Sequence, residues 1–407
     1  MNIGVIGGGA SGCLCAIMLA KKGHSVTLYE KNDKIGKKLY ITGKGRCNLT
    51  NATTGAEFLQ NVVNGNKFIM SAETRFNSND TIELFKGFGV PLKIERGNRV
   101  FPVSDKSSDI IKALQDQLKK HKVNVCLNTT IADIKVNNGE IVGVVVNNKV
   151  INHDVVVVAT GGKSYSATGS TGDGYVWAEK TGHNIVETVP SLVGVNVADK
   201  DIFALEGLSL KNVKISAFIG DKCYYSSPVG EMLFTSGGVS GPIVLSLSAY
   251  INRLDASSIK LFIDFKPALS LEQLEGRISR DISSLGAKQV SSLLEGLLPK
   301  SLCGVFANRL GFLLTDKANQ LSKNQRTALA NMLKQFELSV NSLEGFDRAV
   351  VTSGGVSTKQ ISPRNMQSKL IKNLYFIGEV LDIDALTGGF NLQLAFSTAV
   401  ACASDIN

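Results

Sequence analysis

The chain has 407 residues, of which 43% are hydrophobic and 19% are charged. These proportions exclude a disordered or collagen-like chain, and the length predicts two to three domains. The net charge of +9 admits nucleic acid as a partner, but only 7% of the residues are aromatic. The composition therefore disfavours nucleic acid as the main partner, and a solvated, lysine-rich surface is the preferred explanation of the charge.

Seven scattered cysteines, with no C-x-x-C pair among them, predict reduced thiols in a cytoplasmic protein. Neither a disulfide framework nor a metal site is expected, because the four histidines form no ligand pattern. Residues 2–20 carry no charge. The five glycines among them favour a strand, a turn and a helix over a membrane span.

The first 30 residues have the pattern of a nucleotide-binding βαβ unit. An apolar strand at 3–6 leads into G-x-G-x-x-G at 7–12. A helix over 10–22 and a second strand over 25–29 follow, and Glu30 ends the unit. This order of strand, glycine turn, helix, strand and acid is typical of dinucleotide binding. A glycine-rich turn that holds no ligand is the weaker alternative.

Each part of this unit has a physical task. Gly7 permits the tight turn, Gly9 lets the backbone approach a pyrophosphate, and Gly12 lets the helix pack on the strand. The helix N-terminus offers N–H groups and a positive dipole end to phosphates. Glu30 can accept ribose hydroxyls, which disfavours a 2′-phosphate.

The segment 31–46 carries six basic residues and one acid, which is +5 of the net +9. Two interpretations stay open. The segment is either a solvated loop or a source of positive charge near a pyrophosphate or an acidic substrate.

Two later segments repeat the pattern of a buried strand that ends in small residues. Four valines at 155–158 precede Ala-Thr-Gly-Gly, and a strand at 374–377 precedes Gly378-Glu379. A glycine pair at 388–389 then opens a final helix. Strands that end this way place a ligand at the carboxyl edge of a parallel sheet.

The middle of the chain differs from both flanks. Short strands are predicted at 192–197, 213–219, 232–235 and 259–265, and a helical period follows over 268–337. Ser270 with Gln273, and Ser322 with Gln325, read as capping boxes. We therefore expect three parts: a discontinuous nucleotide-binding domain of residues 1–190 and 346–407, a β-rich inserted substrate domain of 191–267 with 338–345, and a helical subdomain of 268–337.

The three glycine segments together resemble the FAD signature of glutathione-reductase-type flavoproteins. More narrowly, five segments resemble the bacterial BaiN-type family of NAD(P)/FAD-dependent oxidoreductases, to which aminoacetone oxidase is also similar. They are ITGKGRCNLTN (41–51), ATGSTGDGY (167–175), GVSGPIVLSLS (238–248), TSGGVSTKQISPRNMQSK (352–369) and GEVLD (378–382). The resemblance covers nearly the whole chain. It implies an α/β fold, in which a Rossmann-like FAD-binding domain carries an inserted β-rich and α-helical domain.

The resemblance also implies which residues hold non-covalent FAD. They are Gly7, Gly9, Ala10, Ser11, Gly12, Glu30, Lys31, Lys38, Gly45, Arg46, Asn48, Ile131 (by its backbone, near the adenine), Ala159, Thr160, Gly161, Gly378, Glu379, Gly389, Phe390 and Asn391. Glu379 stands where those flavoproteins usually have Asp, so its contact with the ribitol would be made through a longer side chain.

The leading hypothesis is an FAD-dependent oxidoreductase that transfers hydride between the flavin and a small or medium organic substrate. Arg46, Asn48 and Tyr165 are the catalytic candidates: Arg46 would clamp a carboxylate or polarise a carbonyl, and Tyr165 would donate a proton. For each, a purely structural hydrogen bond is the alternative. The other partner would be either NAD(P)H or oxygen. NAD(P)H would bind transiently, because no second Rossmann unit is visible. A flavin-containing protein that modifies or binds RNA, and a flavin module without turnover, are the two other classes.

Overall fold

The computed structural model describes residues 1–407 and separates them into two units. Unit 1 comprises Met1–Ser191 and Phe346–Asn407, and unit 2 comprises Leu192–Gly345. Each unit has its own hydrophobic core. The functional assignment of the three predicted domains stays a prediction.

A five-stranded parallel sheet forms the centre of unit 1. Its strand order is β21 (Leu374–Phe376), β11 (Val155–Val158), β1 (Asn2–Ile6), β2 (Ser25–Tyr29) and β7 (Asn124–Cys126). The neighbours of β11 are β1 and β21, which lie on either side of it, and all four of its valines are buried. A strand covered on both faces needs no polar alternation, which explains the run of valines.

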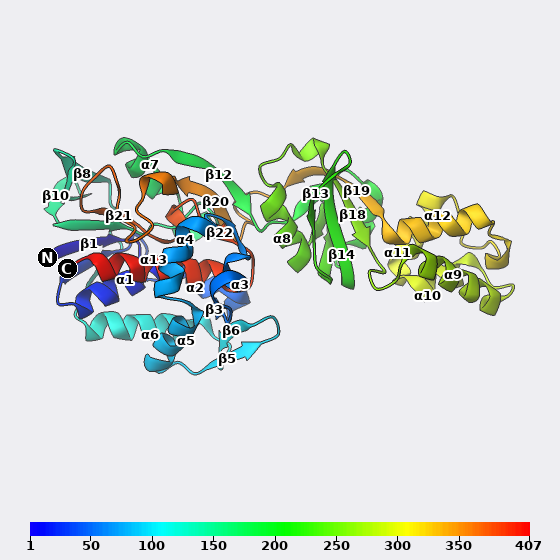
Figure 1. Ribbon diagram of the computed structural model, residues 1–407, viewed down its shortest axis with the longest axis horizontal. Coiled ribbons are helices and arrows are strands. Elements are labelled where there is room, and N and C mark those ends of the chain that lie inside the picture. Colours follow the sequence, from blue (N-terminus) through cyan, green and yellow to red (C-terminus); the bar gives the residue numbers. More distant parts are fainter. The chain divides into compact units, whose positions relative to one another are not determined.

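Helices and smaller sheets surround this central sheet. The first helix, α1 (Ala10–Lys21), lies beside the last, α13 (Phe390–Asp405), although almost 370 residues of sequence separate them (Figure 1). The other helices of unit 1 are α2 (Lys37–Ile41), α3 (Gly55–Leu59), α4 (Asn66–Arg75), α5 (Ser78–Gly87), α6 (Ser107–Lys120) and α7 (Asp173–Lys180). Its other strands are β3 (Thr50–Asn51), β4 (Val62–Asn64), β5 (Leu92–Glu95), β6 (Arg99–Pro102), β8 (Asp133–Asn137), β9 (Glu140–Val146), β10 (Lys149–Asn152), β12 (Ile185–Ser191), β20 (Val351–Val356) and β22 (Asp384–Ala385).

Unit 2 is built on antiparallel strands whose pairings close into a ring. In order they are β15 (Lys222–Ser226), β14 (Ser209–Ile219), β16 (Gly230–Thr235), β17 (Gly238–Ser240), β13 (Val195–Val197), β19 (Phe336–Leu343) and β18 (Lys260–Asp264). Because β14 also pairs with β18, the strands from β14 round to β18 form a closed barrel with β15 attached at its side. Closure leaves few strand edges unpaired.

Five helices complete unit 2. They are α8 (Pro242–Ile251), which packs on the barrel, followed by α9 (Leu271–Leu285), α10 (Val290–Leu297), α11 (Lys300–Leu310) and α12 (Lys323–Lys334) (Figure 1). The capping boxes predicted at Ser270 and Ser322 are both present. The predicted fold class is confirmed: a Rossmann-like α/β unit carries an insertion with a β-rich part and a helical part. No helix of the chain is both long enough and apolar enough to cross a bilayer.

Candidate active site

The glycine turn after β1 shows why three of its positions carry no side chain. Gly7 has a φ of +109°, and a Cβ atom there would lie 2.4 Å from the carbonyl oxygen of Ala159. A Cβ atom at Gly12 would lie 1.9 Å from the carbonyl oxygen of Gly7. At Gly9 a Cβ atom would meet nothing within 4 Å. Close packing therefore requires Gly7 and Gly12, whereas Gly9 borders open space that a ligand can use.

The N-terminus of α1 faces that open space with its N–H groups available. Gly9 is the N-cap residue, so Ala10 and Ser11 begin the helix; no side chain caps it and its first turn contains no acid. Such a terminus favours an anion such as a pyrophosphate. The third glycine segment meets it here, because a Cβ atom on Gly378 would lie 2.5 Å from Ser11 Oγ.

Glu30 ends β2 as a buried carboxylate that is held by backbone and side-chain donors. Its Oε2 accepts from the Gly8 N–H at 2.8 Å, and its Oε1 accepts from Asn32 N and Nδ2 at 2.9 and 2.7 Å. A carboxylate has about four acceptor positions, so one remains for a ribose hydroxyl. The buried Ile131 follows Thr129, whose N–H donates to the Glu30 carbonyl, so the segment predicted near the adenine adjoins the acid.

Two lysines of the basic segment 31–46 are tied into unit 1 by ion pairs. Lys31 pairs with Asp173 at 2.7 Å. Lys38 pairs with Glu379 at 2.7 Å and also donates to Ser164 Oγ at 2.6 Å. Lys38 and Glu379 are about one-fifth exposed, and the pair joins α2 to the segment after β21. For these two lysines the solvated-loop interpretation does not hold.

Arg46 lies in a cluster of charges instead of projecting freely from its loop. Its guanidinium bonds Glu95 and Asp105 at 2.5 Å and stacks over the Phe101 ring. Hydrogen bonds from Arg46 lower the pKa of Glu95, and those from Lys93 and then Arg46 lower the pKa of Asp105. The cluster anchors the loop Gly43–Arg46 to the β5–β6 hairpin and the segment after it. Gly45, in that loop, has open space where a side chain would be.

Buried polar atoms without a hydrogen-bond partner mark this region of unit 1. They include Asn48 Oδ1, Thr160 Oγ1 and Tyr175 Oη. Native proteins rarely leave such atoms unpaired without a ligand, ion or water. Thr160 lies between Ala159 and Gly161 at the carboxyl end of β11, where the sequence predicts FAD contacts.

The N-terminus of α13 provides a second helix end with free N–H groups. Gly389 is its N-cap with a φ of +101°, and no side-chain cap or acid is present in the first turn, where Phe390 lies. A Cβ atom on Gly389 would lie 2.4 Å from the Thr50 backbone, so the helix end touches β3. The Asn391 side chain bonds the backbone of Ala385 at 3.0 and 2.7 Å and shapes the preceding loop.

Tyr165, the predicted proton donor, has a backbone that few non-glycine residues adopt. Its φ of 54° is left-handed, which costs of order 1–3 kcal/mol and is typical of functional positions. No hydrogen bond of its hydroxyl occurs within the chain.

Burial raises the pKa of the Cys47 thiol to about 12, so that cysteine is protonated and unreactive.

Some residues of this region were not among the sequence candidates. Tyr175 is buried, and burial followed by the charges of Glu379 and Asp382 raises its pKa. It belongs to the segment 171–175, whose T-G-D-G-Y pattern was the available signal. Gln393 bonds Thr50, Thr81, the Phe76 carbonyl and Ser397 while fully buried. A lone Gln inside a helical stripe offers no such signal.

The residues present fit FAD. Two uncapped helix N-termini, the open space at Gly9 and an acid with a free acceptor position match the charges and hydroxyls of a dinucleotide. The unpaired Asn48 and Thr160 atoms supply further hydrogen-bonding positions. The contacts of individual residues with FAD stay predictions.

Comparison with known proteins agrees with this geometry. Residues 1–405 match the family described as HI0933-like protein Rossmann domain. The chain is 34% identical to a ribosomal RNA dihydrouridine synthase of Haemophilus influenzae, over 99% of this chain and 98% of that protein. It is 30% identical to a 3-dehydro-bile acid delta(4,6)-reductase of Clostridium scindens, over 98% and 97%. A ribosomal RNA dihydrouridine synthase of Escherichia coli is also 30% identical, over 99% and 97%.

Solved structures share the fold at low sequence identity. The 3-ketosteroid delta1-dehydrogenase from Sterolibacterium denitrificans aligns with a TM-score of 0.51 and 13% identity, over 99% of this chain and 98% of that one. The FrdA chain of E. coli quinol fumarate reductase aligns with a TM-score of 0.52 and 14% identity, over 99% and 69%. The family match spans nearly the whole sequence, so the chain belongs to the HI0933-like family and is an FAD-dependent oxidoreductase with the Rossmann fold of that family.

Proposed function

We propose that the protein reduces a carbon–carbon double bond conjugated to a carbonyl group. The names of the three relatives that match over their whole length support this reaction. Dihydrouridine is uridine whose C5–C6 double bond, conjugated to the C4 carbonyl, has gained two hydrogens. A delta(4,6)-reductase of a 3-dehydro compound acts on double bonds conjugated to the 3-oxo group. The two names differ in substrate but share this chemistry, and both run in the direction of reduction.

NAD(P)H is the proposed donor. Bound FAD would supply hydride transfer from NAD(P)H to the alkene carbon remote from the carbonyl. The balance requires one further proton at the neighbouring carbon, and NAD(P)+ is released. The sequence alone leaves oxygen open as the other partner, and the reductive names of the relatives favour NAD(P)H.

The chain's own residues would orient and protonate the substrate. Tyr165 is proposed as the proton donor, because its hydroxyl has no partner and its backbone is held in the left-handed region. Asn48, whose Oδ1 is buried and unpaired, would hold a flavin or substrate N–H group. Arg46 is already engaged by two carboxylates, which supports a positioning role for its loop over a clamp on substrate.

The first candidate substrate is a uracil base in ribosomal RNA. Two of the three full-length relatives carry that name, including the one at 34% identity. The charge agrees with an anionic substrate: unit 1 contains 28 basic and 21 acidic residues, and unit 2 contains 16 and 14. On the sequence alone RNA ranks below a small molecule, and the names of two relatives make it the leading candidate.

The second candidate is a steroid-like dienone. The bile acid reductase, 30% identical over 98% of this chain, supports it. The same flavin chemistry serves both candidates, so only the substrate distinguishes them.

A single anaerobic assay tests the proposal. FAD-loaded protein and NADPH or NADH would be incubated with ribosomal RNA lacking dihydrouridine, and in parallel with a 3-oxo-4,6-diene steroid. Mass spectrometry would detect the gain of two hydrogens in a nucleoside or in the steroid. Dihydrouridine supports the first candidate, and a reduced steroid supports the second. A flavin that NAD(P)H reduces but neither substrate reoxidises would overturn both.

A further inference from the structure

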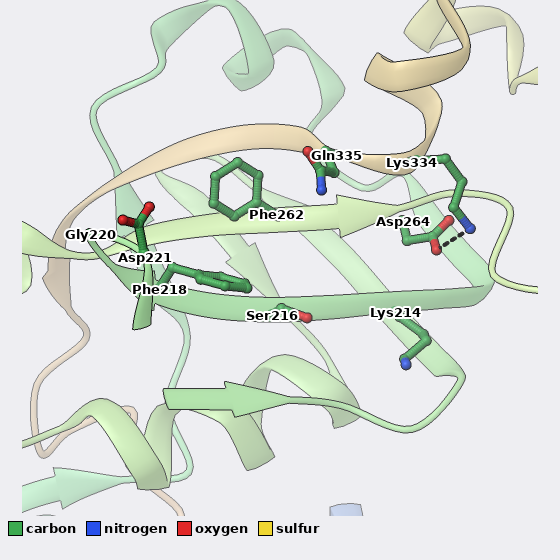
Figure 2. Close-up of a pocket in the computed structure, with 9 residues that line it drawn as sticks. All are labelled: Lys214, Ser216, Phe218, Gly220, Asp221, Phe262, Asp264, Lys334 and Gln335. Atoms are coloured by element: carbon green, nitrogen blue, oxygen red, sulfur yellow. Dashed lines mark ion pairs between the residues drawn. The ribbon is translucent and has the colours of Figure 1, made fainter. Parts of the chain in front are cut away.

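A groove on the outer surface of the barrel in unit 2 is lined by aromatic and charged side chains that the packing of the barrel core does not require. It encloses about 360 Å³ and is lined by Lys214, Ser216, Phe218, Gly220, Asp221, Phe262, Asp264, Lys334 and Gln335 (Figure 2). A volume of this size is at the lower end of the range for small-molecule sites. None of these residues belongs to the predicted flavin site.

Strand alternation explains which side chains form the floor of the groove. In β14, Ile215 and Ala217 are buried in the barrel core, so Ser216 and Phe218 face outward. In β18, Phe262 faces outward between two buried neighbours and pairs in register with Ser216. The floor is therefore the solvent side of the sheet, where polar residues are usual.

Two phenylalanines on this solvent side form an aromatic platform. The rings of Phe218 and Phe262 contact edge to face, with centroids 5.5 Å apart. Both side chains are only half-buried, so part of each ring remains available to a ligand. An outward aromatic pair contributes little to the barrel core, and it can stack against a flat base.

The charges around the platform leave one cation and one acid unpaired. Lys334 neutralises Asp264 at 2.6 Å, and beside the groove Lys260 neutralises Glu337 at 2.6 Å. Lys214 has no ion pair and lies at one end of the platform (Figure 2). Asp221, also unpaired, lies at the other end in the β14–β15 turn. Along the strand, Lys214 and Phe218 are about 14 Å apart.

We infer that this groove binds a short stretch of single-stranded RNA. A base would stack on Phe218 and Phe262, a phosphate would pair with Lys214, and the Asp221 carboxylate would accept from a base N–H group. Aromatic side chains that stack on bases and cations that pair with phosphates are the elements by which proteins bind single strands without reading a long sequence. The inference rests on the proposed RNA substrate and assigns it a second contact outside the flavin site.

The inference is tested by measuring how tightly the FAD-loaded protein binds a fluorescein-labelled, single-stranded fragment of the RNA substrate. Phe218→Leu keeps an apolar side chain but removes the ring, and should weaken binding about 5- to 150-fold. Lys214→Ala should reduce the slope of log K against log salt by about 0.7, the loss of one phosphate contact. Lys211→Ala is the matched control, because Lys211 is also on β14, exposed, unpaired and outside the groove.

Three outcomes separate the inference from the proposed function. Weaker binding in both groove variants, with unchanged Lys211→Ala binding and unchanged FAD content, supports the inference. Dihydrouridine formation with wild-type affinity in both groove variants overturns the inference and leaves the proposed function standing. A wild-type protein that reduces the dienone but binds no RNA overturns the RNA substrate, and the inference with it.

Discussion

The replacement Gly9→Ala tests whether Gly9 is needed to bind a ligand and not to form the fold. The new methyl group would meet no protein atom within 4 Å. Because Gly9 is the N-cap of α1 with a φ of −82°, alanine fits its backbone. Alanine is a poorer cap than glycine, so the apoprotein should lose no more than about 1 kcal/mol of unfolding free energy.

The cost should appear in the affinity for FAD. A methyl group placed where the pyrophosphate approaches the backbone overfills that space, at about 1–3 kcal/mol. This corresponds to an affinity about 5- to 150-fold lower. In contrast, Gly12→Ala puts a methyl group 1.9 Å from the Gly7 carbonyl oxygen, and should destabilise the apoprotein by about 3 kcal/mol or more.

Two measurements on the apoprotein test these values. Quenching of FAD fluorescence gives the dissociation constant, and urea unfolding gives the stability. Gly87→Ala is the control, because Gly87 also has open space around it but lies at the end of α5. A folded Gly9→Ala protein with wild-type FAD affinity would refute the assignment of the open space to the pyrophosphate.

Three further predictions concern polar groups of unit 1. Lys38→Met leaves the Glu379 carboxylate without its cation and should cost about 1–3 kcal/mol in urea unfolding. The same change at Lys37, whose ion pair is more exposed, should cost less than about 1 kcal/mol, and equal losses would contradict this reasoning. Tyr165→Phe should lower kcat about 100-fold while FAD affinity is retained; an unchanged kcat would remove Tyr165 as the proton donor. Burial raises the pKa of Tyr29 to about 12 from 10.0. The folded state therefore holds this proton more tightly, and stability should fall as pH rises from about 10 to 12. Tyr29→Phe should flatten that part of the pH profile, and an identical decline in both proteins would contradict the assignment.

Local patterns in the sequence predicted individual strands and helix starts in both units. The glycine spacing at 7–12 and the valine run at 155–158 predicted the strands and the turn, because these depend on neighbouring residues alone. The capping boxes at Ser270 and Ser322 predicted two helix starts for the same reason. The resemblance of five longer segments, the first at 41–51 and the last at 378–382, to the BaiN-type flavoproteins predicted the family.

Partners distant in the sequence were beyond such patterns. The contact of Arg46 with ligand stays a prediction, and nothing local indicated that Arg46 pairs with Glu95 and Asp105, which lie 49 and 59 residues away. Lys38 and Glu379, 341 residues apart, were each predicted as FAD contacts, and nothing local indicated that they form an ion pair. Long charged side chains can reach many partners, so their pairing is decided only when the backbone brings distant segments together.

The groove in unit 2 shows the same division between sequence and tertiary structure. The sequence by itself determined that β14 alternates between inward and outward residues, because successive side chains of a strand point to opposite faces. Only the pairing of β14 with β18, which closes the barrel, placed Phe218 beside Phe262 and left Lys214 unpaired. Alternation is a property of one strand, whereas an aromatic platform depends on the register between two strands far apart in the chain.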